Sequence, residues 1–379
     1  MRPITFFVPA PLDARTGGSI YDCRMAAALR ARGCSVDVVE LDASFPYPTP
    51  AALDRAGRAL ASVEADTIAV VDSLAFGAMP DVIVREAARL RIVALMHLPL
   101  AATFGLDRET AARFDVDERR ALHAAALVVV TGTAAVPLLA RDTLPDNRVV
   151  VVEPGTDPAP LARGSSPAEA GHYDLGSDVR DHIADDDGDV VSGFSRTTQL
   201  LCVASLNAIK GHDMLLEALA AVPNRNWHLT CAGSLTRDPA TADGVGAAMT
   251  RLGLDRHVTL AGDLNQLALA ACYDRADLFV LATRQETYGM AVAEALARGL
   301  PVVATMTGAL AKLVGSQAGL LVPVGDTAAL TAALTRMLDD PSLRARLAEG
   351  ARHVRDRLPT WDEAAGRMAA ALASVDAHG

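Results

Sequence analysis

Residues 277–301 read DLFVLATRQETYGMAVAEALARGLP, and this stretch decides the fold. Its apolar beginning is typical of a strand that is buried on both faces of a parallel sheet. A polar turn follows, and the alanine-rich segment beyond it predicts a helix that ends at Gly299, because Pro301 cannot continue a helix. A strand that passes through a short turn into a helix is the repeating unit of an α/β protein.

The same alternation runs along the rest of the chain and predicts two α/β domains. Strands are expected near 4–8, 35–40, 67–71, 91–96, 126–131 and 148–152, and again near 200–204, 227–232, 257–260, 277–282, 301–304 and 319–322. We expect two Rossmann-like domains that face each other across a cleft. Their predicted bounds are 1–155 with a returning helix at 359–379, a linker with an acidic surface insertion at 156–198, and 199–358.

Composition narrows the functions that this chain can have. Its formal net charge of −11 argues against a nucleic-acid partner, because phosphate binding requires a basic surface. No apolar run reaches the ~20 residues that span a bilayer, so we expect membrane association to be at most peripheral. The five cysteines lack metal-ligand spacing, and Cys202 and Cys231 lie in apolar runs typical of a core. These features predict a cytoplasmic protein of a reducing compartment.

The turn and helix after residue 282 carry the strongest chemical signal. Glu286 precedes the predicted helix and Glu294 lies about one turn inside it. The helix N-terminus between them, near residues 288–291, presents free amide groups that suit a diphosphate. The two carboxylates then suit hydroxyl groups on either side of it. The residues leave a second interpretation equally open, in which Glu294 stabilises the helix dipole and Glu286 is an unrelated loop residue.

This segment resembles the donor-site motif of retaining glycosyltransferase family 4, a group with the GT-B fold. The resemblance rests on two glutamates eight positions apart, followed by ALA-x-G-x-PVVA. It continues through Gly308, residues 319–326 and Trp361. The resemblance implies that Glu286 faces the transferred sugar and Glu294 holds the ribose. It also implies that the amides of Tyr288, Gly289 and Met290 hold the distal phosphate, and we assign Thr287 to the same donor site.

A second motif, LLCVASLNAIKGHDMLLEAL at 200–219, places Lys210 before a predicted helix. A cation is disfavoured there unless it shares an anion with the helix, and the family has a phosphate-binding lysine at this position. The chain departs from the family at Ser205, where an arginine is usual. Arg284 is our candidate to replace that charge. We assign Ser205 and Gly233 to donor binding.

The N-terminal half offers weaker signals. The loop of residues 15–19 between strand and helix resembles a glycine-rich phosphate or acceptor loop, with Gly17, Gly18 and Ser19 as its contacts, although a plain tight turn explains it equally well. His97 ends a predicted strand, and the family often has a histidine near the transferred sugar. A structural role for His97 is an equal alternative. Asp72 is a similar, weaker case.

These residues predict a metal-independent transfer of a sugar from a nucleoside-diphosphate sugar to an unidentified acceptor, with retention of anomeric configuration. Catalytic residues would be Glu286, Lys210 and His97, and no cofactor is expected. The AspAspAsp run at 185–187 fits a metal-binding pattern, but it lies in a polar linker and we reject it. The alternatives are a GT-B type nucleotide-sugar epimerase or phosphorylase, and a catalytically weak protein that only binds nucleotide.

Overall fold

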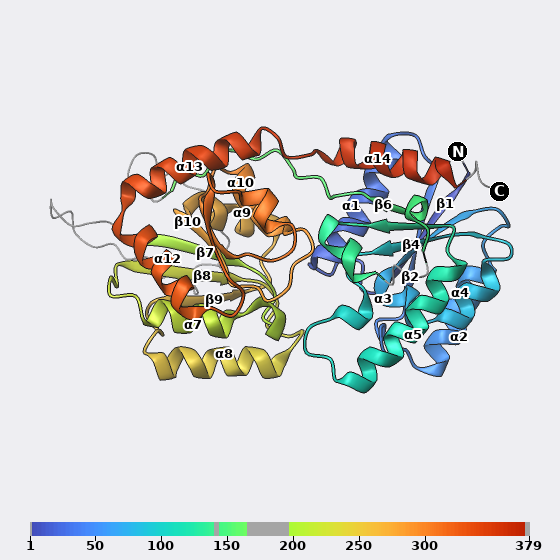
Figure 1. Ribbon diagram of the computed structural model, residues 1–379, viewed down its shortest axis with the longest axis horizontal. Helices are drawn as coiled ribbons and strands as arrows, with labels where there is room; N and C mark the ends of the chain where they lie inside the picture. The colour runs from blue at the N-terminus through green and yellow to red at the C-terminus, as the bar shows by residue number, and fades with distance from the viewer. Residues whose placement is uncertain (1, 140–143, 165–196, 376–379) are drawn as a thin grey trace. The chain divides into compact units, whose positions relative to one another are not determined.

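The computed structural model describes residues 2–139, 144–164 and 197–375. The chain divides into two units, the first made of Met1–Asp157 with Pro359–Gly379 and the second of Pro158–Leu358. Each unit has a six-stranded parallel sheet as its central layer, with helices on both faces (Figure 1). The candidate insertion at 156–198 and the run at 185–187 fall mainly or wholly outside the described residues.

The sheet of the first unit has the strand order β2-β1-β3-β4-β5-β6. Its strands are β1 (Ile4–Pro9), β2 (Val36–Leu41), β3 (Ile68–Asp72), β4 (Arg91–Met96), β5 (Leu127–Val130) and β6 (Val149–Val151). Every residue of β3 and β5 is buried, as expected for valine-rich strands covered on both faces. From β1 the chain continues to β2 on one side of the sheet, and from β3 it continues to β4 on the other side, so the connections run in opposite directions from these two neighbouring strands. Such a switch point opens a crevice at the carboxyl ends of the strands.

The helices of the first unit are α1 (Gly17–Ala31), α2 (Pro50–Ala61), α3 (Ser73–Phe76), α4 (Pro80–Glu86), α5 (Arg108–Ala124) and α14 (Trp361–Ser374), with 3₁₀ turns η1 (Leu100–Ala102), η2 (Thr133–Leu138) and η4 (Asp146–Arg148). Except for α4, each α-helix of the first unit begins at a residue whose side chain caps it. The C-terminal helix α14 packs on α1, although more than 300 residues separate them. Thr360 and Glu363 form a capping box at its start, and Trp361 is buried beside Tyr21.

The sheet of the second unit has the strand order β12-β11-β10-β7-β8-β9. Its strands are β7 (Thr198–Val203), β8 (Trp227–Ala232), β9 (Val258–Gly262), β10 (Leu278–Leu281), β11 (Val302–Thr305) and β12 (Gly319–Val322). This is the order of a dinucleotide-binding fold, with its switch point between β7 and β10. The segments that follow β7 and β10 therefore meet at one crevice, although about 80 residues separate them in the sequence.

The helices of the second unit cover both faces of this sheet. They are α7 (His212–Ala220), α8 (Pro239–Leu252), α9 (Gln266–Arg275), α10 (Met290–Ala297), α11 (Leu310–Val314), α12 (Thr327–Asp339) and α13 (Pro341–Arg355), with the 3₁₀ turn η5 (Ala208–Lys210). Helices α7 and α12 pack together, as do α10 and α13. No helix among the described residues is both long and apolar enough to cross a bilayer.

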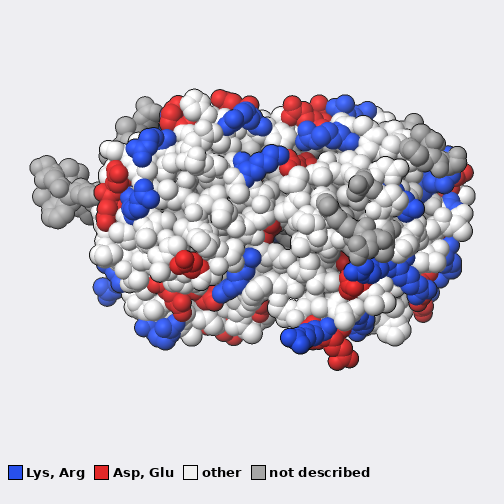
Figure 2. Space-filling view, viewed as in Figure 1, with Lys and Arg blue, Asp and Glu red and all other residues white. Residues whose placement is uncertain are grey.

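The predicted α/β class and the predicted strands are confirmed, since each of the twelve expected ranges overlaps an observed strand. One local prediction is wrong. Residues 15–19 were expected to be a loop, but α1 begins at Gly17, because the Thr16 side chain accepts the Ser19 amide and caps the helix there. Gly17, Gly18 and Ser19 are thus the first helical turn. The described acidic and basic side chains are interspersed on the face shown in Figure 2.

Candidate functional site

The switch point of the second unit brings Lys210 and Glu286 together. Lys210 ends the short turn η5 after β7, and Glu286 lies in the segment after β10. The Lys210 Nζ is 2.8 Å from Glu286 Oε2, and the two side chains are 25% and 17% exposed. The two residues were predicted to have separate roles. The structure pairs them directly, in a place where ligands of open α/β sheets bind.

Backbone hydrogen bonds tie the two segments together beneath this ion pair. The Arg284 amide donates to the Ile209 carbonyl at 2.7 Å, and the buried Thr283 hydroxyl lies 3.3 Å from the same oxygen. On the other side, Asn207 Oδ1 accepts the Lys210 amide and caps η5. Lys210 and Glu286 are therefore carried on a cross-linked pair of loops, which limits how far their backbones can separate.

The N-terminus of α10 lies next to Glu286. The helix starts at Met290, within the range of residues 288–291 expected for its N-terminus, and Gly289 precedes it with a φ of 98°. A side chain at 289 would place its Cβ 2.4 Å from Leu310 Cδ2, so glycine alone fits this approach to the helix. Among the described residues no side chain caps this helix start, which leaves the amides of its first turn available to an anion. The Thr287 amide is different, since it donates to Glu286 Oε1 at 3.2 Å.

Glu294 lies one turn into α10 and has a partner that the sequence reasoning missed. The Tyr273 hydroxyl of α9 is 2.9 Å from Glu294 Oε2 and 3.2 Å from the Ala291 carbonyl oxygen. Burial and the Glu294 charge raise the pKa of Tyr273 well above its usual value, so the phenol remains a donor. The Arg298 guanidinium stacks 4.4 Å from the Tyr273 ring centre. Tyr273 thus orients the carboxylate, and no motif spacing could have identified it.

The remaining donor-site candidates lie at the same edge of the sheet. Ser205 follows β7 and Gly233 follows β8, and their backbones pack so closely that a Cβ at 233 would be 2.7 Å from the Ser205 nitrogen. The Tyr288 side chain is buried against Ala293 and Ala309. Arg284, the candidate replacement for the missing arginine, donates to Asp213 Oδ2 at 2.7 Å and to the Ala208 carbonyl oxygen at 2.5 Å. Its guanidinium therefore braces the Lys210 loop.

The first unit has its own cluster at its switch point. His97 follows β4, and its Nε2 lies 3.0 Å from Asp22 Oδ1 of α1 and 3.2 Å from Asp72 Oδ2 at the end of β3. Gly18 makes room for this arrangement, because a Cβ there would be 3.2 Å from His97 Cδ2. Both aspartates are buried. The sequence suggested no partner for His97, since Asp22 lies inside a helix and pairs with it only through the fold.

The electrostatics of this cluster favour a charged imidazole. Burial opposes protonation of His97, but the charges and hydrogen bonds of Asp22 and Asp72 outweigh it and raise the pKa of His97 to about 10. Burial raises the pKa of Asp22 to about 6, against the attraction of His97. The three donor atoms are also close enough to bind a cation. Asp72 uses one carboxylate oxygen to cap α3 through the Leu74 amide and the other to contact His97. Since both of its oxygens already have partners, we interpret the cluster as a protonated His97 held between two carboxylates.

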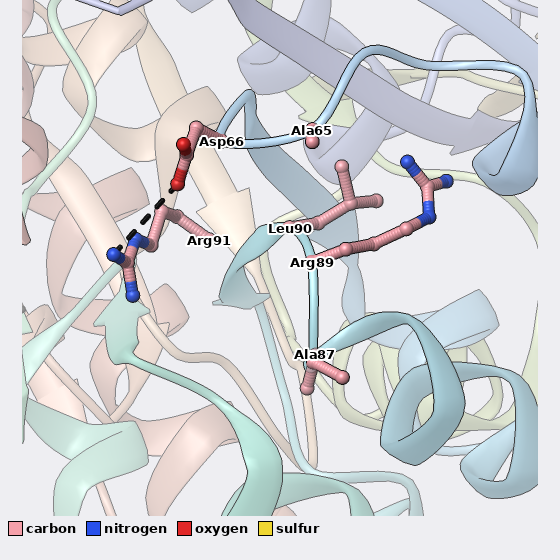
Figure 3. Close-up of a pocket in the computed structure, with 7 residues that line it drawn as sticks. Ala65, Asp66, Ala87, Arg89, Leu90 and Arg91 are labelled. Atoms are coloured by element: carbon pink, nitrogen blue, oxygen red, sulfur yellow. Dashed lines mark ion pairs between the residues drawn. The ribbon is translucent and has the colours of Figure 1, made fainter.

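A surface hollow in the first unit lies away from the switch point of that unit. It is lined by residues 65–66 and 87–91, at the ends where β3 and β4 begin (Figure 3). Asp66 pairs with Arg91 across it at 3.8 Å. Ligands of open α/β sheets bind at the opposite, carboxyl edge, so this hollow is not the candidate site.

Comparison with known proteins gives the family that this region resembles. Residues 197–340, which contain Lys210, Glu286 and Glu294, match the family model described as Glycosyl transferases group 1. Two similar relatives are both named D-inositol 3-phosphate glycosyltransferase. The one from Salinispora arenicola is 32% identical over 268 residues, 64% of this chain and 54% of the relative. The one from Jonesia denitrificans is 30% identical over 268 residues, 69% of this chain and 60% of the relative. The chain thus spans little more than half the length of these curated relatives.

Solved structures match along the whole chain. Sucrose-phosphate synthase from Thermosynechococcus elongatus is 21% identical with a TM-score of 0.78, and the match covers 100% of both chains. The Anabaena protein HepE in complex with UDP-glucose is 18% identical with a TM-score of 0.72, covering 98% of this chain and 99% of that one. At these identities the likeness establishes the fold. Residues 197–340 therefore carry a domain of the glycosyl transferases group 1 family, within a chain that has the GT-B fold.

Proposed function

We propose that this protein is a retaining glycosyltransferase of family 4 that transfers a sugar from a nucleoside-diphosphate sugar. The observation that carries the proposal is the Lys210–Glu286 pair beside the uncapped N-terminus of α10, at the switch point of the second unit. A cation and a set of free amides at one crevice suit a diphosphate, and the neighbouring carboxylates suit hydroxyl groups. UDP is the first nucleotide to test, because the similar HepE structures contain UDP, with glucose or as UDP-glucose.

In this proposal, the donor separates the ion pair. Lys210 leaves Glu286 for the distal phosphate, where it and the α10 amides stabilise the charge of the leaving diphosphate. Glu286 then accepts hydrogen bonds from the transferred sugar. Glu294, held by the Tyr273 hydroxyl, accepts from the ribose hydroxyls. A phosphate oxygen helps to deprotonate the acceptor on the face from which the diphosphate departs, which gives retention of configuration.

We also propose that the transfer needs no added divalent cation, since Lys210 and the helix amides supply the positive charge. From the resemblance we also propose a catalytic role for His97 of the first unit, and acceptor or phosphate contacts for Gly17, Gly18 and Ser19. The acceptor is unidentified. The two curated relatives are named for D-inositol 3-phosphate, so this compound is the first acceptor to test.

A thermal-shift panel with UDP, ADP, GDP and dTDP, followed by transfer assays with the matching sugar conjugates, tests the proposal. One nucleotide family should raise the unfolding midpoint, since a ligand at a hundred times its Kd adds ~2.7 kcal/mol. Transfer should continue without Mg²⁺ or Mn²⁺ and disappear in the Glu286→Ala variant, while nucleotide binding remains. Transfer that survives in Glu286→Ala would rule out our site.

The second candidate is a protein that binds nucleotide without turnover. Ser205 stands where the family has an arginine, and Arg284 is engaged by Asp213 and Ala208. Binding of a nucleotide with no transfer to any acceptor and no epimerisation or phosphorolysis of its sugar conjugate would favour this candidate. Introducing Ser205→Arg should then increase turnover if the missing charge is the cause.

A further inference from the structure

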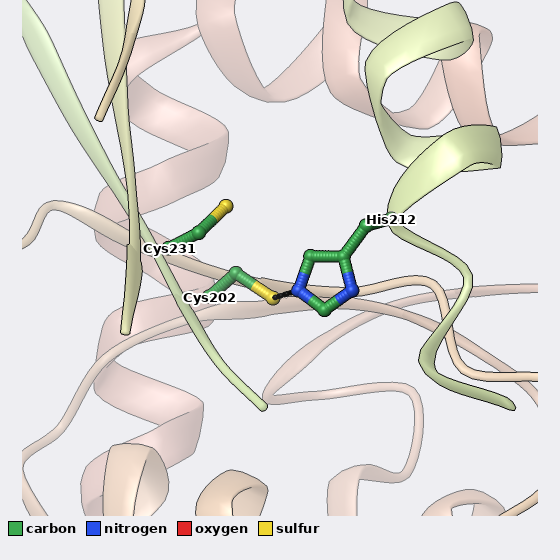
Figure 4. Close-up of side chains that lie close together, drawn as sticks. All are labelled: Cys202, His212 and Cys231. Carbon is green, nitrogen blue, oxygen red and sulfur yellow. Dashed lines mark hydrogen bonds between the residues drawn. The ribbon is translucent and has the colours of Figure 1, made fainter. Parts of the chain in front are cut away.

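Three side chains that could ligate a metal converge in the core of the second unit, apart from the Lys210–Glu286 pair. They are Cys202 of β7, Cys231 of β8 and His212, the first residue of α7 (Figure 4). All three residues are buried, with 1%, 1% and 2% of their surface exposed. Their donor atoms, two sulfurs and one imidazole nitrogen, all lie within 4.8 Å of one another.

The fold fixes this convergence. Cys202 and Cys231 are register partners on adjacent parallel strands, so both side chains point to the same face of the sheet. The helix α7 begins above that face, and His212 reaches down so that its Nε2 is 3.8 Å from Cys202 Sγ (Figure 4). The sequence spacing of these residues follows no metal motif, so only the strand pairing brings them together.

Their geometry is close to that of a zinc site. Tetrahedral Zn²⁺ with Zn–S near 2.3 Å and Zn–N near 2.0 Å would separate the ligand atoms by roughly 3.5–3.8 Å. The 3.8 Å between Cys202 Sγ and His212 Nε2 lies at the upper end of this range. The other ligand atoms lie within 4.8 Å of one another, so they would have to approach by at most about 1 Å to bind Zn²⁺. Small rotations about side-chain bonds supply such a shift.

Charge also favours a cation here. A thiolate in an apolar core is costly unless a positive charge compensates it. In addition, the buried His212 Nδ1 has no hydrogen-bond partner among the described residues, and the ring's other nitrogen, Nε2, faces Cys202 Sγ. Two thiolates and Zn²⁺ would form a neutral unit.

We propose that Cys202, His212 and Cys231 form a binding site for Zn²⁺ in the second unit. Three protein ligands with an open fourth position is a known zinc arrangement. The site is separate from the proposed donor site, and the proposal does not depend on the proposed function. Because His212 is two residues from Lys210, bound Zn²⁺ would also fix the start of α7 and the loop before it.

The test uses the full chain, stripped with a chelator under reducing conditions, then dialysed against Zn²⁺ and analysed for metal content. The expected result is one Zn²⁺ per chain. Replacing the metal by Co²⁺ should give the near-ultraviolet absorption of cobalt–thiolate bonds. Removing a residue that only supports a metal ligand typically weakens metal binding about 10–100-fold. Cys231 and His212 would bind the metal directly, so Cys231→Ser and His212→Asn should each weaken Zn²⁺ binding by more than about 100-fold.

Cys272→Ser is the matched control, because Cys272 lies in the same unit but outside the cluster. It should bind Zn²⁺ as the unaltered protein does. Circular dichroism of the metal-free variants separates loss of a ligand from loss of fold. Should a variant fail to fold, the cobalt spectrum of the unaltered protein still decides. No retained Zn²⁺ in the unaltered protein, absent thiolate absorption, or unchanged binding in folded Cys231→Ser would each overturn the proposal.

Discussion

The Lys210 ammonium lies 2.8 Å from the Glu286 carboxylate, although 76 residues separate them in the chain. Each residue follows one of the two strands, β7 and β10, that flank the switch point of the second unit. The pair is partly exposed, so it is accessible to a ligand that competes for either charge. A diphosphate would compete for Lys210, and the carboxylate that it displaces would become free for sugar hydroxyls.

This relationship predicts opposite effects of two substitutions on nucleoside-diphosphate binding. Lys210→Ala should weaken binding by at least tenfold, because a charge-assisted hydrogen bond of about 1.5–3 kcal/mol is lost. Glu286→Gln should leave binding unchanged or tighten it, since the competing carboxylate charge is gone, while it lowers kcat. Calorimetric titration measures both. Lys312→Ala is the control, because Lys312 is the only other lysine in the sequence and is exposed. Equal weakening by both site substitutions would contradict competition for Lys210.

Tyr273→Phe should weaken nucleotide binding through Glu294. The phenol is buried, and its hydroxyl is 2.9 Å from the carboxylate that we assign to the ribose. Losing that hydrogen bond should lower the free energy of unfolding by about 0.5–1.5 kcal/mol and leave Glu294 less well oriented. The KM for the donor should therefore rise more than kcat falls. Tyr47→Phe, at an exposed tyrosine of the first unit, should change neither. With a donor that contains 2′-deoxyribose, Tyr273→Phe should raise the KM no further, because the ribose hydroxyl that Glu294 would bind is already missing.

His97 should remain protonated well above neutral pH. Its pKa is raised to about 10, so its contribution to stability is complete below 6.5 and is lost as the pH rises towards 10. Asp22→Asn removes the strongest of the charges that raise it and should bring the pKa of His97 down. Imidazole nitrogen chemical shifts measure the titration directly. Asp37→Asn, on an exposed position of β2, is the control. A neutral His97 at pH 7 in the unaltered protein would remove the basis for the clamped imidazolium.

Glu118 should make the protein less stable as the pH rises to neutrality. This carboxyl of α5 is buried and accepts a hydrogen bond of 2.9 Å from the amide of Leu100, a residue in the segment that follows His97. Burial raises its pKa from 4.5 to about 7, against the amides of Leu100 and Ala101. The folded state therefore holds the proton more tightly, and the stabilisation present below pH 4.5 is lost as the pH passes 7. One pKa unit corresponds to 1.36 kcal/mol, so the shift from 4.5 to about 7 should lower the free energy of unfolding by about 3 kcal/mol between low and high pH.

Denaturant unfolding at pH 4.5, 6 and 8 checks this prediction. Glu118→Gln should flatten the dependence, because glutamine keeps the acceptor oxygen but cannot ionise. Glu109→Gln, in the exposed first turn of the same helix, should retain it. A pH profile that Glu118→Gln leaves unaltered would assign the loss to other groups.

Local patterns placed Glu286, Glu294 and Lys210 beside predicted helix starts, and the resemblance to the glycosyltransferase family gave them their proposed roles. The structure adds the contact between Lys210 and Glu286. The start of α1 was misjudged by three residues, because consecutive glycines predict a loop more strongly than the capping hydroxyl of Thr16 predicts a helix. Asp22 and Tyr273 were missed, since each is an unremarkable residue within a helix.

Sequence patterns alone were sufficient to predict the α/β class, the approximate ranges of the twelve strands seen in the described residues, and the residues that follow them. Hydrophobic runs and helix signals act over a few residues, so they can be read without knowing the fold. Only the tertiary structure decided which strands are neighbours. That order places Glu286 against Lys210, Asp22 and Asp72 around His97, and Cys202 beside Cys231 and His212. These contacts depend on the order of the strands and on how the helices pack against the sheet, and local sequence patterns carry no information about either.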